Sequence, residues 1–249
     1  MEPELSYTIW FSQRTGSTLL CQALESTGIA GRPREWLLEG DLLERYGARD
    51  HAELRETLWE MGSTSNGVFG LKVSFYEPHV SEVLETLGAA SPGSQGSATR
   101  AQIWHAAFPR CRHIFMTRRN KVRLAVSWWK AIKTGEWHRK AGHPSRAVDL
   151  EEAYSFDAIN HLCCESVMRE AGIQAFLSEA GVAPLTIVYE DFIEEYEATV
   201  LTVLKYLGLE TGSVNVAAPA YQQMADDVSE AWVQRFREER QRGWENRGW

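Results

Sequence analysis

The stretch from Ser6 to Gly28, SYTIWFSQRTGSTLLCQALESTG, decides the fold of this chain of 249 residues. Its first part, SYTIWF at residues 6–11, is rich in aromatic and β-branched residues and predicts a buried strand. Its last part, LLCQALESTG at residues 19–28, has the spacing of a helix and ends at a glycine. The polar segment between them contains Gly16. The stretch therefore predicts a strand, a glycine-containing turn and a helix.

Three further strand candidates lie at residues 67–75, 112–117 and 183–189. A helical pattern follows each of the last two candidates. Strands that alternate with helices indicate a parallel sheet that is covered on both faces. We therefore predict a single α/β domain over residues 1–249, in which the tail from residue 229 onward forms an amphipathic, charge-rich helix.

The turn between the first strand and the first helix has the composition of an anion site. In this position, backbone N–H groups and the positive end of the helix dipole point at one place, which suits a phosphate or a sulfate. Gly16 permits close approach of the backbone, Ser17 and Thr18 carry hydroxyls, and Arg14 adds a charged fork. The alternative is a helix whose Ser and Thr side chains serve only its own first turn.

The same turn differs from the loop that binds nucleoside triphosphates. That loop requires G-x-x-x-x-G-K-[ST], in which the lysine reaches the β- and γ-phosphates and the hydroxyl binds magnesium. Here Ser17 and Thr18 follow Gly16 directly, and no lysine precedes them. None of the seven histidines has metal-like spacing. The turn therefore favours a mononucleotide phosphosulfate without a metal.

A second anion site is predicted where the strand at 112–117 ends. Arg118 and Arg119 follow this strand, and Ser127 lies two turns along the next helix. These side chains can reach one phosphate near the carboxyl edge of the sheet. Two anion sites on one open sheet suggest a bisphosphorylated nucleotide. The alternative is that the arginines are solvated and that Ser127 bonds back to its own helix.

Composition excludes other classes of protein. The net charge of −8 argues against a protein that coats nucleic acid. The N-terminal segment, MEPELSYTIWFSQ, lacks the basic and apolar regions of a signal peptide. No uninterrupted apolar run approaches the roughly 20 residues that span a bilayer. We therefore expect no transmembrane segment and a cytoplasmic protein.

At this point the motifs resemble those of a known family. The segments SQRTGST and TRRNKVRLAVSWW resemble sulfotransferases, in which an arginine and a serine spaced like Arg119 and Ser127 hold the 3′-phosphate of the donor. The sequence is most similar to the bacterial trehalose sulfotransferase family. Four further motifs carry this likeness: GRPREW at 31–36, GLK at 70–72, AVSWWKAIKTGEW at 125–137 and SEAWVQRFREE at 229–239.

The resemblance implies a P-loop-like three-layer α/β/α fold, 3′-phosphoadenylyl sulfate (PAPS) as the donor and adenosine 3′,5′-bisphosphate as the product. It also implies a carbohydrate acceptor such as trehalose or a related sugar or glycolipid, no metal, and a possible homodimer. The residues predicted to bind the donor are Arg14, Thr15, Gly16, Ser17, Thr18, Arg118, Arg119 and Ser127. The double arginine leaves open which of Arg118 and Arg119 holds the 3′-phosphate. The region 40–66 is shorter than in the family, which leaves the acceptor and the assembly less defined.

Transfer to a sugar hydroxyl requires a group that takes the hydroxyl proton. By resemblance and by its place after the first helix, Glu35 is the predicted base, and the neighbouring Trp36 is expected to shield it from water and to contact the acceptor. Arg14 and Lys72 are expected to stabilise charge on the sulfuryl and bridging oxygens. The alternatives are that Glu35 pairs with a neighbouring arginine on the surface and that Lys72 is merely solvated.

Two other functions remain open from the sequence alone. One is a nucleotide-dependent small-molecule kinase on the same type of sheet. The other is a non-catalytic nucleotide-binding module whose C-terminal helix docks a partner. A basic segment at residues 137–146 is expected to cover the donor, to recruit an anionic partner or to lie on a solvated face. A Gly- and Ser-rich loop is expected at 89–100.

Overall fold

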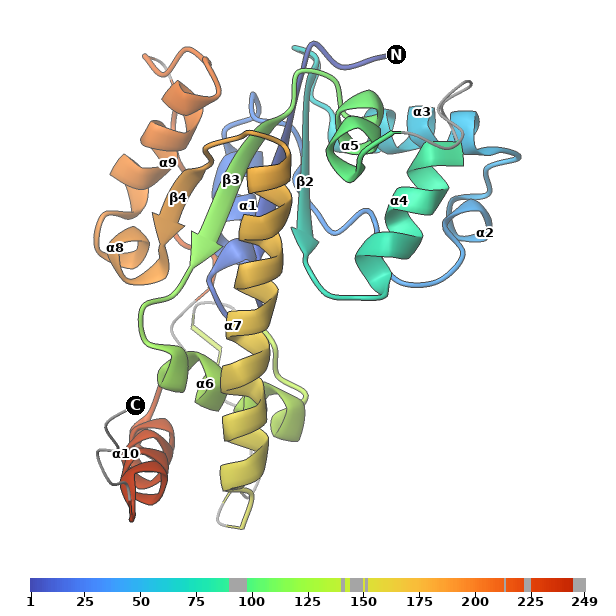
Figure 1. Ribbon diagram of the computed structural model, residues 1–249. Helices are drawn as coiled ribbons and strands as arrows, with labels where there is room; N and C mark the ends of the chain where they lie inside the picture. Colours follow the sequence, from blue (N-terminus) through green and yellow to red (C-terminus); the bar gives the residue numbers. More distant parts are fainter. Residues whose placement is uncertain are drawn as a thin grey trace.

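In the computed structural model, four parallel strands form one sheet in the order β2-β1-β3-β4 (Figure 1). The structure describes residues 1–89, 98–139, 142–143, 150, 152–212, 214–221 and 225–243. The strands are β1 (Leu5–Phe11), β2 (Val68–Ser74), β3 (Arg112–Thr117) and β4 (Leu185–Val188). The ends of all four strands differ from the predicted ends by at most two residues.

Helices connect and flank these strands in the described part of the chain. They are α1 (Ser17–Ser26), α2 (Leu42–Tyr46), α3 (His51–Gly62), α4 (His79–Ala89), α5 (Arg100–Ala107), α6 (Lys121–Thr134), α7 (Phe156–Glu179), α8 (Tyr189–Glu194), α9 (Tyr196–Tyr206) and α10 (Asp227–Gln241).

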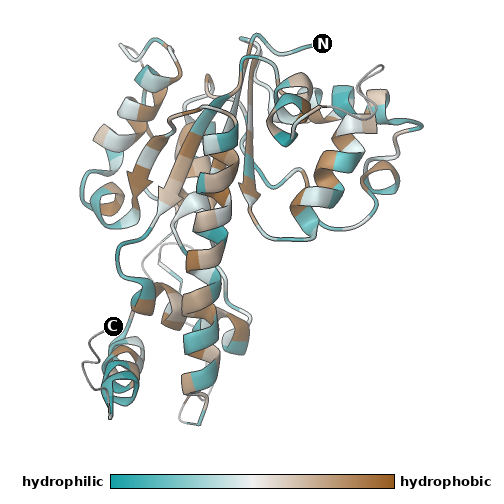
Figure 2. Cartoon of the chain, viewed as in Figure 1, coloured by the Kyte–Doolittle hydropathy of each residue, from teal (hydrophilic) through white to brown (hydrophobic). Residues whose placement is uncertain are grey.

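Alternating side chains of β1 build a core on each face of the sheet. Ile9 is fully buried among side chains of α1 and α9. Trp10 points to the opposite face, where its ring centroid lies 4.8 Å from that of Trp104 on α5 and 5.0 Å from that of Phe176 on α7. Figure 2 shows the hydrophobic residues gathered on the strands between the two helical layers. The predicted three-layer α/β/α arrangement is confirmed.

A third apolar cluster lies beyond the carboxyl ends of the strands. Helix α7 extends past the sheet, and its first half lies beside α6 and α10 (Figure 1). Ile159 and Leu162 of α7 are buried there with Trp232 and Phe236 of α10. This cluster supports the helices that surround the carboxyl edge of the sheet.

The strand order places a crevice at the end of β1. From β1 the chain runs to β2 on one side and returns to β3 on the other side of β1. Loops that leave neighbouring parallel strands in opposite directions open a crevice at their carboxyl ends. The segment after β1 leads into α1 and the segment after β3 leads into α6. Both predicted anion segments therefore meet at this switch point.

A strap formed by Gly31–Trp36 covers the outer edge of β2. Arg34 forms a parallel bridge with Leu71, and its carbonyl accepts a hydrogen bond of 2.9 Å from the N–H of Lys72. Gly31 has a φ of +69°, and a Cβ there would lie 2.8 Å from the nitrogen of Gly70. Only glycine fits so close to another backbone. The strap fixes Glu35 beside the end of β2.

Some elements differ from the predictions. The helix predicted after β4 is divided into α8 and α9, because Glu195 has a φ of −117° and a ψ of 52°. The C-terminal helix begins earlier than predicted, since the Asp226 side chain caps it by accepting from the N–H of Ser229. Residues 90–97 of the predicted Gly- and Ser-rich loop lie outside the described residues. Among the described helices, none is both long and apolar enough to cross a membrane.

Candidate active site

A cavity of about 970 Å³ opens at the carboxyl ends of the strands. Its volume lies near the top of the range for small-molecule sites, which is roughly 300–1,000 Å³. We name two parts of its wall. The anion end consists of Arg14, Gly16, Ser17, Thr18, Arg118 and Ser127, and the carboxylate end consists of Glu35, Glu39, Lys72 and Tyr76.

The N-terminus of α1 forms the back of the anion end. Gly16 is its N-cap residue with a φ of 82°, and within the described part of the chain no side chain caps this helix. The hydroxyl of Thr15 turns away from the helix and donates to the carbonyl of Ser12 at 2.8 Å. The structure therefore departs from the alternative of a self-capped helix, and leaves the first-turn N–H groups to the cavity.

Arg14 crosses the anion end from the loop after β1. It adopts a left-handed backbone conformation with a φ of 66°, and its Nε donates to Ser127 Oγ at 3.0 Å. A further N–H donates to the carbonyl of Trp137. Burial, together with the nearby charge of Arg118, lowers the pKa of Arg14 to about 10. Two guanidinium groups close together favour a bound anion.

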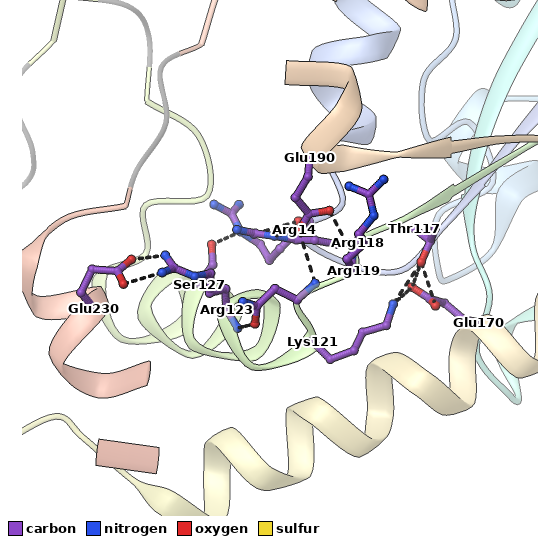
Figure 3. A network of polar contacts seen from close by, with 11 residues as sticks. Arg14, Thr117, Arg118, Arg119, Lys121, Arg123, Ser127, Glu170, Glu190 and Glu230 are labelled. Atoms are coloured by element: carbon purple, nitrogen blue, oxygen red, sulfur yellow. Dashed lines mark hydrogen bonds and ion pairs between the residues drawn. The ribbon is translucent and has the colours of Figure 1, made fainter. Parts of the chain in front are cut away.

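The structure separates the two neighbouring arginines (Figure 3). Arg118 lines the cavity, where its guanidinium lies 4.5 Å from the ring centroid of Tyr189. Arg119 points to solvent with 59% of its side chain exposed, and it forms an ion pair of 2.5 Å with Asp191. Only Arg118 is therefore placed at the anion end, although which arginine holds a 3′-phosphate stays a prediction.

Lys72 joins the two ends of the cavity. Its Nζ lies 2.7 Å from Glu35 Oε1 and donates to Thr18 Oγ1 at 2.9 Å. The residue is only 8% exposed, in contrast to the alternative of a solvated lysine. Glu35 is 40% exposed and pairs with Lys72 instead of a neighbouring arginine. Arg34 instead pairs with Glu25 at 2.8 Å.

Trp36 lies behind the carboxylate end, in the core beside β2. It is 8% exposed, and its indole N–H donates to the carbonyls of Arg32 and Gly70, each at 3.1 Å. It does not belong to the residues that line the cavity. The shielding of Glu35 by Trp36 and its contact with an acceptor both stay predictions.

Arg169 of α7 is a wall residue that the sequence analysis missed. Its guanidinium donates to Gln13 Oε1 at 2.8 Å and to Ser74 Oγ at 3.1 Å. It also lies 4.4 Å from the ring centroid of Tyr76 and 5.1 Å from that of Trp128. These contacts connect the loop after β1 with the end of β2. Nothing near Arg169 in the sequence marked it, because α7 itself was not predicted.

Glu170, the next residue of α7, connects the segments that carry the anion end. This residue is 8% exposed and accepts hydrogen bonds from Thr117 Oγ1 at 3.0 Å and from Lys121 Nζ at 2.5 Å (Figure 3). Ser12 Oγ donates to the same carboxylate at 3.4 Å. The end of β1, the end of β3 and the start of α6 thus share one buried carboxylate.

His138 lies over the start of α1. Its Nε2 lies 3.5 Å from Thr18 Oγ1, and its ring stacks on that of Tyr221 with centroids 5.2 Å apart. Burial and the charges of Arg14 and Lys72 lower its pKa to about 4, so the imidazole is neutral at pH 7. Of the predicted basic segment at 137–146, residues 140–141 and 144–146 lie outside the described residues, whereas 137–139 line the cavity. Among the residues that the structure describes, no group of three or more His, Cys, Asp or Glu side chains is placed to hold a metal ion.

A helix N-terminus without a side-chain cap among the described residues and two half-buried arginines at the switch point of a parallel sheet are typical of an α/β protein that binds anions. Residues 6–239 match the family described as Stf0 sulphotransferase. The chain belongs to this family, and it is a sulfotransferase. Its membership confirms the predicted resemblance and speaks against the kinase and the non-catalytic module.

Two relatives and one solved structure extend this likeness. Trehalose 2-sulfotransferase of Mycobacterium tuberculosis is 30% identical over 260 residues, which cover 94% of this chain and 94% of the relative. That of Mycolicibacterium smegmatis is 29% identical over 264 residues, which cover 95% and 96%. A sulfotransferase crystal structure from Alicyclobacillus acidocaldarius superposes with a TM-score of 0.50 at 16% identity, covering 95% of this chain and 92% of that chain. It shares the fold, in agreement with the predicted P-loop-like architecture.

Proposed function

We propose that this protein transfers the sulfuryl group of PAPS to a hydroxyl of a carbohydrate, either trehalose or a related sugar or glycolipid. The observation that carries the proposal is Lys72, whose Nζ contacts Glu35 of the carboxylate end and Thr18 of the anion end. A group that activates a hydroxyl and a group that holds an anion are thereby joined through one cation. The two relatives named as trehalose 2-sulfotransferases support a sugar as the acceptor.

The residues of the anion end fit a phosphorylated donor. Arg118 Nε is buried and has no hydrogen-bond partner among the described residues, and it lies 3.6 Å from Glu190 Oε1. The first turn of α1 has no side-chain cap from the part of the chain that the structure describes. Phosphate and sulfate oxygens are acceptors that suit both groups. When bound, PAPS supplies a sulfuryl group attached to a good leaving group, its 5′-phosphate.

The proposed roles follow from charge and position. Arg14 and the N–H groups of α1 hold oxygens of the 5′-phosphate, and Arg118 and Ser127 hold the 3′-phosphate. Lys72 stabilises the negative charge that develops on the leaving oxygen. Glu35 takes the proton of the sugar hydroxyl while the hydroxyl oxygen bonds to sulfur and the bond from sulfur to the phosphate oxygen breaks.

The first experiment tests the donor. We expect adenosine 3′,5′-bisphosphate to raise the unfolding midpoint of the protein more than AMP or ATP with magnesium, because a ligand that binds the folded state stabilises it by mass action. The second incubates the enzyme with PAPS and a panel of sugars and detects sulfated products by mass spectrometry. The proposal is contradicted if ATP with magnesium gives the larger shift. It is also contradicted if PAPS is consumed but no sugar of the panel becomes sulfated.

The predicted compartment and assembly belong to the same proposal: a cytoplasmic homodimer. Light scattering of the purified protein, with and without the bisphosphate, measures the assembly. Fractionation of the cells that produce the protein measures the compartment. A monomer under both conditions contradicts the dimer without affecting the proposed reaction.

A further inference from the structure

Helix α6 presents a polar stripe to the cavity. Arg123, Ser127 and Lys130 are spaced at i, i+4 and i+7, and all three line the cavity. Side chains with this spacing are neighbours on one helix face. Ser127 already belongs to the anion end through its hydrogen bond with Arg14. The stripe therefore extends the positive charge of the anion end along α6.

The first turn of α10 places carboxylates on this stripe. Glu230 pairs with two nitrogens of Arg123, of which Nη2 lies 2.6 Å from Oε2 (Figure 3). Asp226 pairs with Lys130. Arg123 and Glu230 are 38% and 47% exposed and both line the cavity. The carboxylate of Glu230 on α10 therefore pairs with the guanidinium of Arg123, which lies one helical turn from Ser127.

The two pairs differ in their other duties. Asp226 also caps α10, and Lys130 is 8% exposed and donates to Ser229 Oγ at 3.3 Å, so this pair is part of the packing. The side chain of Glu230 does not cap α10 and, being 47% exposed, is not part of the packing. Helix α10 is held independently of Glu230, since Trp232 and Phe236 are buried against α6 and α7. Glu230 can release Arg123 while the helix stays in place.

We infer that Arg123 is a further ligand for the donor phosphate that reaches Ser127, and that Glu230 holds the place of this phosphate in the free enzyme. A phosphate group carries up to about two charges and three acceptor oxygens, whereas a carboxylate carries one charge and two oxygens. The phosphate therefore displaces Glu230 from Arg123. This inference rests on the proposed function, because it concerns the same donor.

The test measures the dissociation constant of adenosine 3′,5′-bisphosphate by calorimetry at constant ionic strength. Glu230→Gln removes the competing carboxylate and should tighten binding by about threefold, the size of an exposed ion pair. Arg123→Gln should weaken it by about tenfold, because it removes a charged hydrogen-bond donor. In the double variant, the gain from Glu230→Gln should vanish. Glu239→Gln is the matched control: Glu239 pairs with Arg235 on the same helix, and neither residue lines the cavity.

Each outcome decides the inference. The inference is overturned if Glu230→Gln binds the bisphosphate no more tightly than the wild type while the control is unchanged. The ion pair between Arg123 and Glu230 is then part of the packing alone. A gain that persists in the double variant also overturns the inference. If Glu230→Gln does not fold, Glu230→Ser provides the same comparison. Failure of the wild type to bind the bisphosphate removes the proposed function itself and is distinct from these results.

Discussion

The two ends of the cavity are built in different ways. The anion end comes from two segments that each follow a strand, and its two arginines are half-buried. The carboxylate end also comes from two segments: Glu35 and Glu39 lie on and after the strap, and Lys72 and Tyr76 lie near and after the end of β2. The anion end therefore depends on turns that lead from a strand into a helix, whereas the carboxylate end depends on the strap that pairs with β2. Substitutions can test whether the two ends are as separable as this difference suggests.

The largest effect is expected for Glu35→Gln. Loss of the proposed general base should lower kcat by roughly 10²- to 10⁴-fold, while the dissociation constant of the bisphosphate stays within about twofold. Steady-state kinetics and calorimetry measure the two quantities. Glu25→Gln is the control, because Glu25 pairs with the strap through Arg34 but does not line the cavity. An equal loss of donor binding in Glu35→Gln would break the separation of the two ends.

The next largest effect is expected on the stability of the protein at acid pH, through a histidine in the sheet. His113 on β3 is fully buried, accepts a hydrogen bond of 2.9 Å from Trp10 Nε1, and has a pKa lowered to about 4 by burial and by His105. The unfolded chain binds a proton near pH 6.5, and the folded chain does so only near pH 4. The stability from neutral His113 is therefore complete above pH 6.5 and is lost as the pH falls toward 4, by about 3 kcal/mol.

Urea unfolding at a series of pH values measures this loss. His113→Asn keeps a hydrogen-bond acceptor for Trp10 and should flatten the decline between pH 6.5 and 4. The same slope in both proteins would show that other groups control the acid limb.

A smaller effect distinguishes the two arginines. Arg118→Ala should weaken binding of the bisphosphate by about 10- to 100-fold, because it removes charged hydrogen bonds inside the cavity. Arg119→Ala should change it by about twofold or less, since Arg119 is exposed and pairs with Asp191. Calorimetry under identical salt conditions compares them. The reverse order would assign the phosphate to Arg119 and require the turn after β3 to rearrange.

The smallest effect tests the backbone of the anion end. Gly16 and Gly28 both have positive φ, but a Cβ at Gly16 would lie 2.7 Å from Tyr189 whereas a Cβ at Gly28 would meet nothing within 4 Å. Gly28→Ala should cost about 1 kcal/mol of unfolding free energy through backbone strain alone, and Gly16→Ala about 2 kcal/mol. Only Gly16→Ala should also weaken bisphosphate binding. Equal costs would mean that Tyr189 moves aside.

The sequence predicted what short segments determine. The strands and the turn at Gly16 depend on local patterns, and the structure agrees with them. The sequence did not indicate α7, because the face of this helix that is buried changes along its length. Ile159 packs against α6 and α10, whereas Phe176 packs against the sheet. No single apolar stripe marks such a helix.

Side-chain direction was the other limit. Arg118 and Arg119 are equivalent in the sequence, and only the direction in which the chain leaves β3 separates them. The neighbours Glu35 and Trp36 were expected to lie together at the acceptor. They diverge after the bridge between Arg34 and Leu71: Glu35 pairs with Lys72 at the cavity, whereas the indole of Trp36 donates to carbonyls in the core.

The same bridge gives the strap at Gly31–Trp36 a second consequence. An uncovered outer strand is a template on which other chains add and aggregate. The strap occupies hydrogen-bonding groups of β2, including the N–H of Lys72, and it also carries Glu35. A substitution that loosens the strap is therefore expected to expose the edge of β2 and to displace Glu35 at the same time, so solubility and the proposed reaction are coupled at this segment.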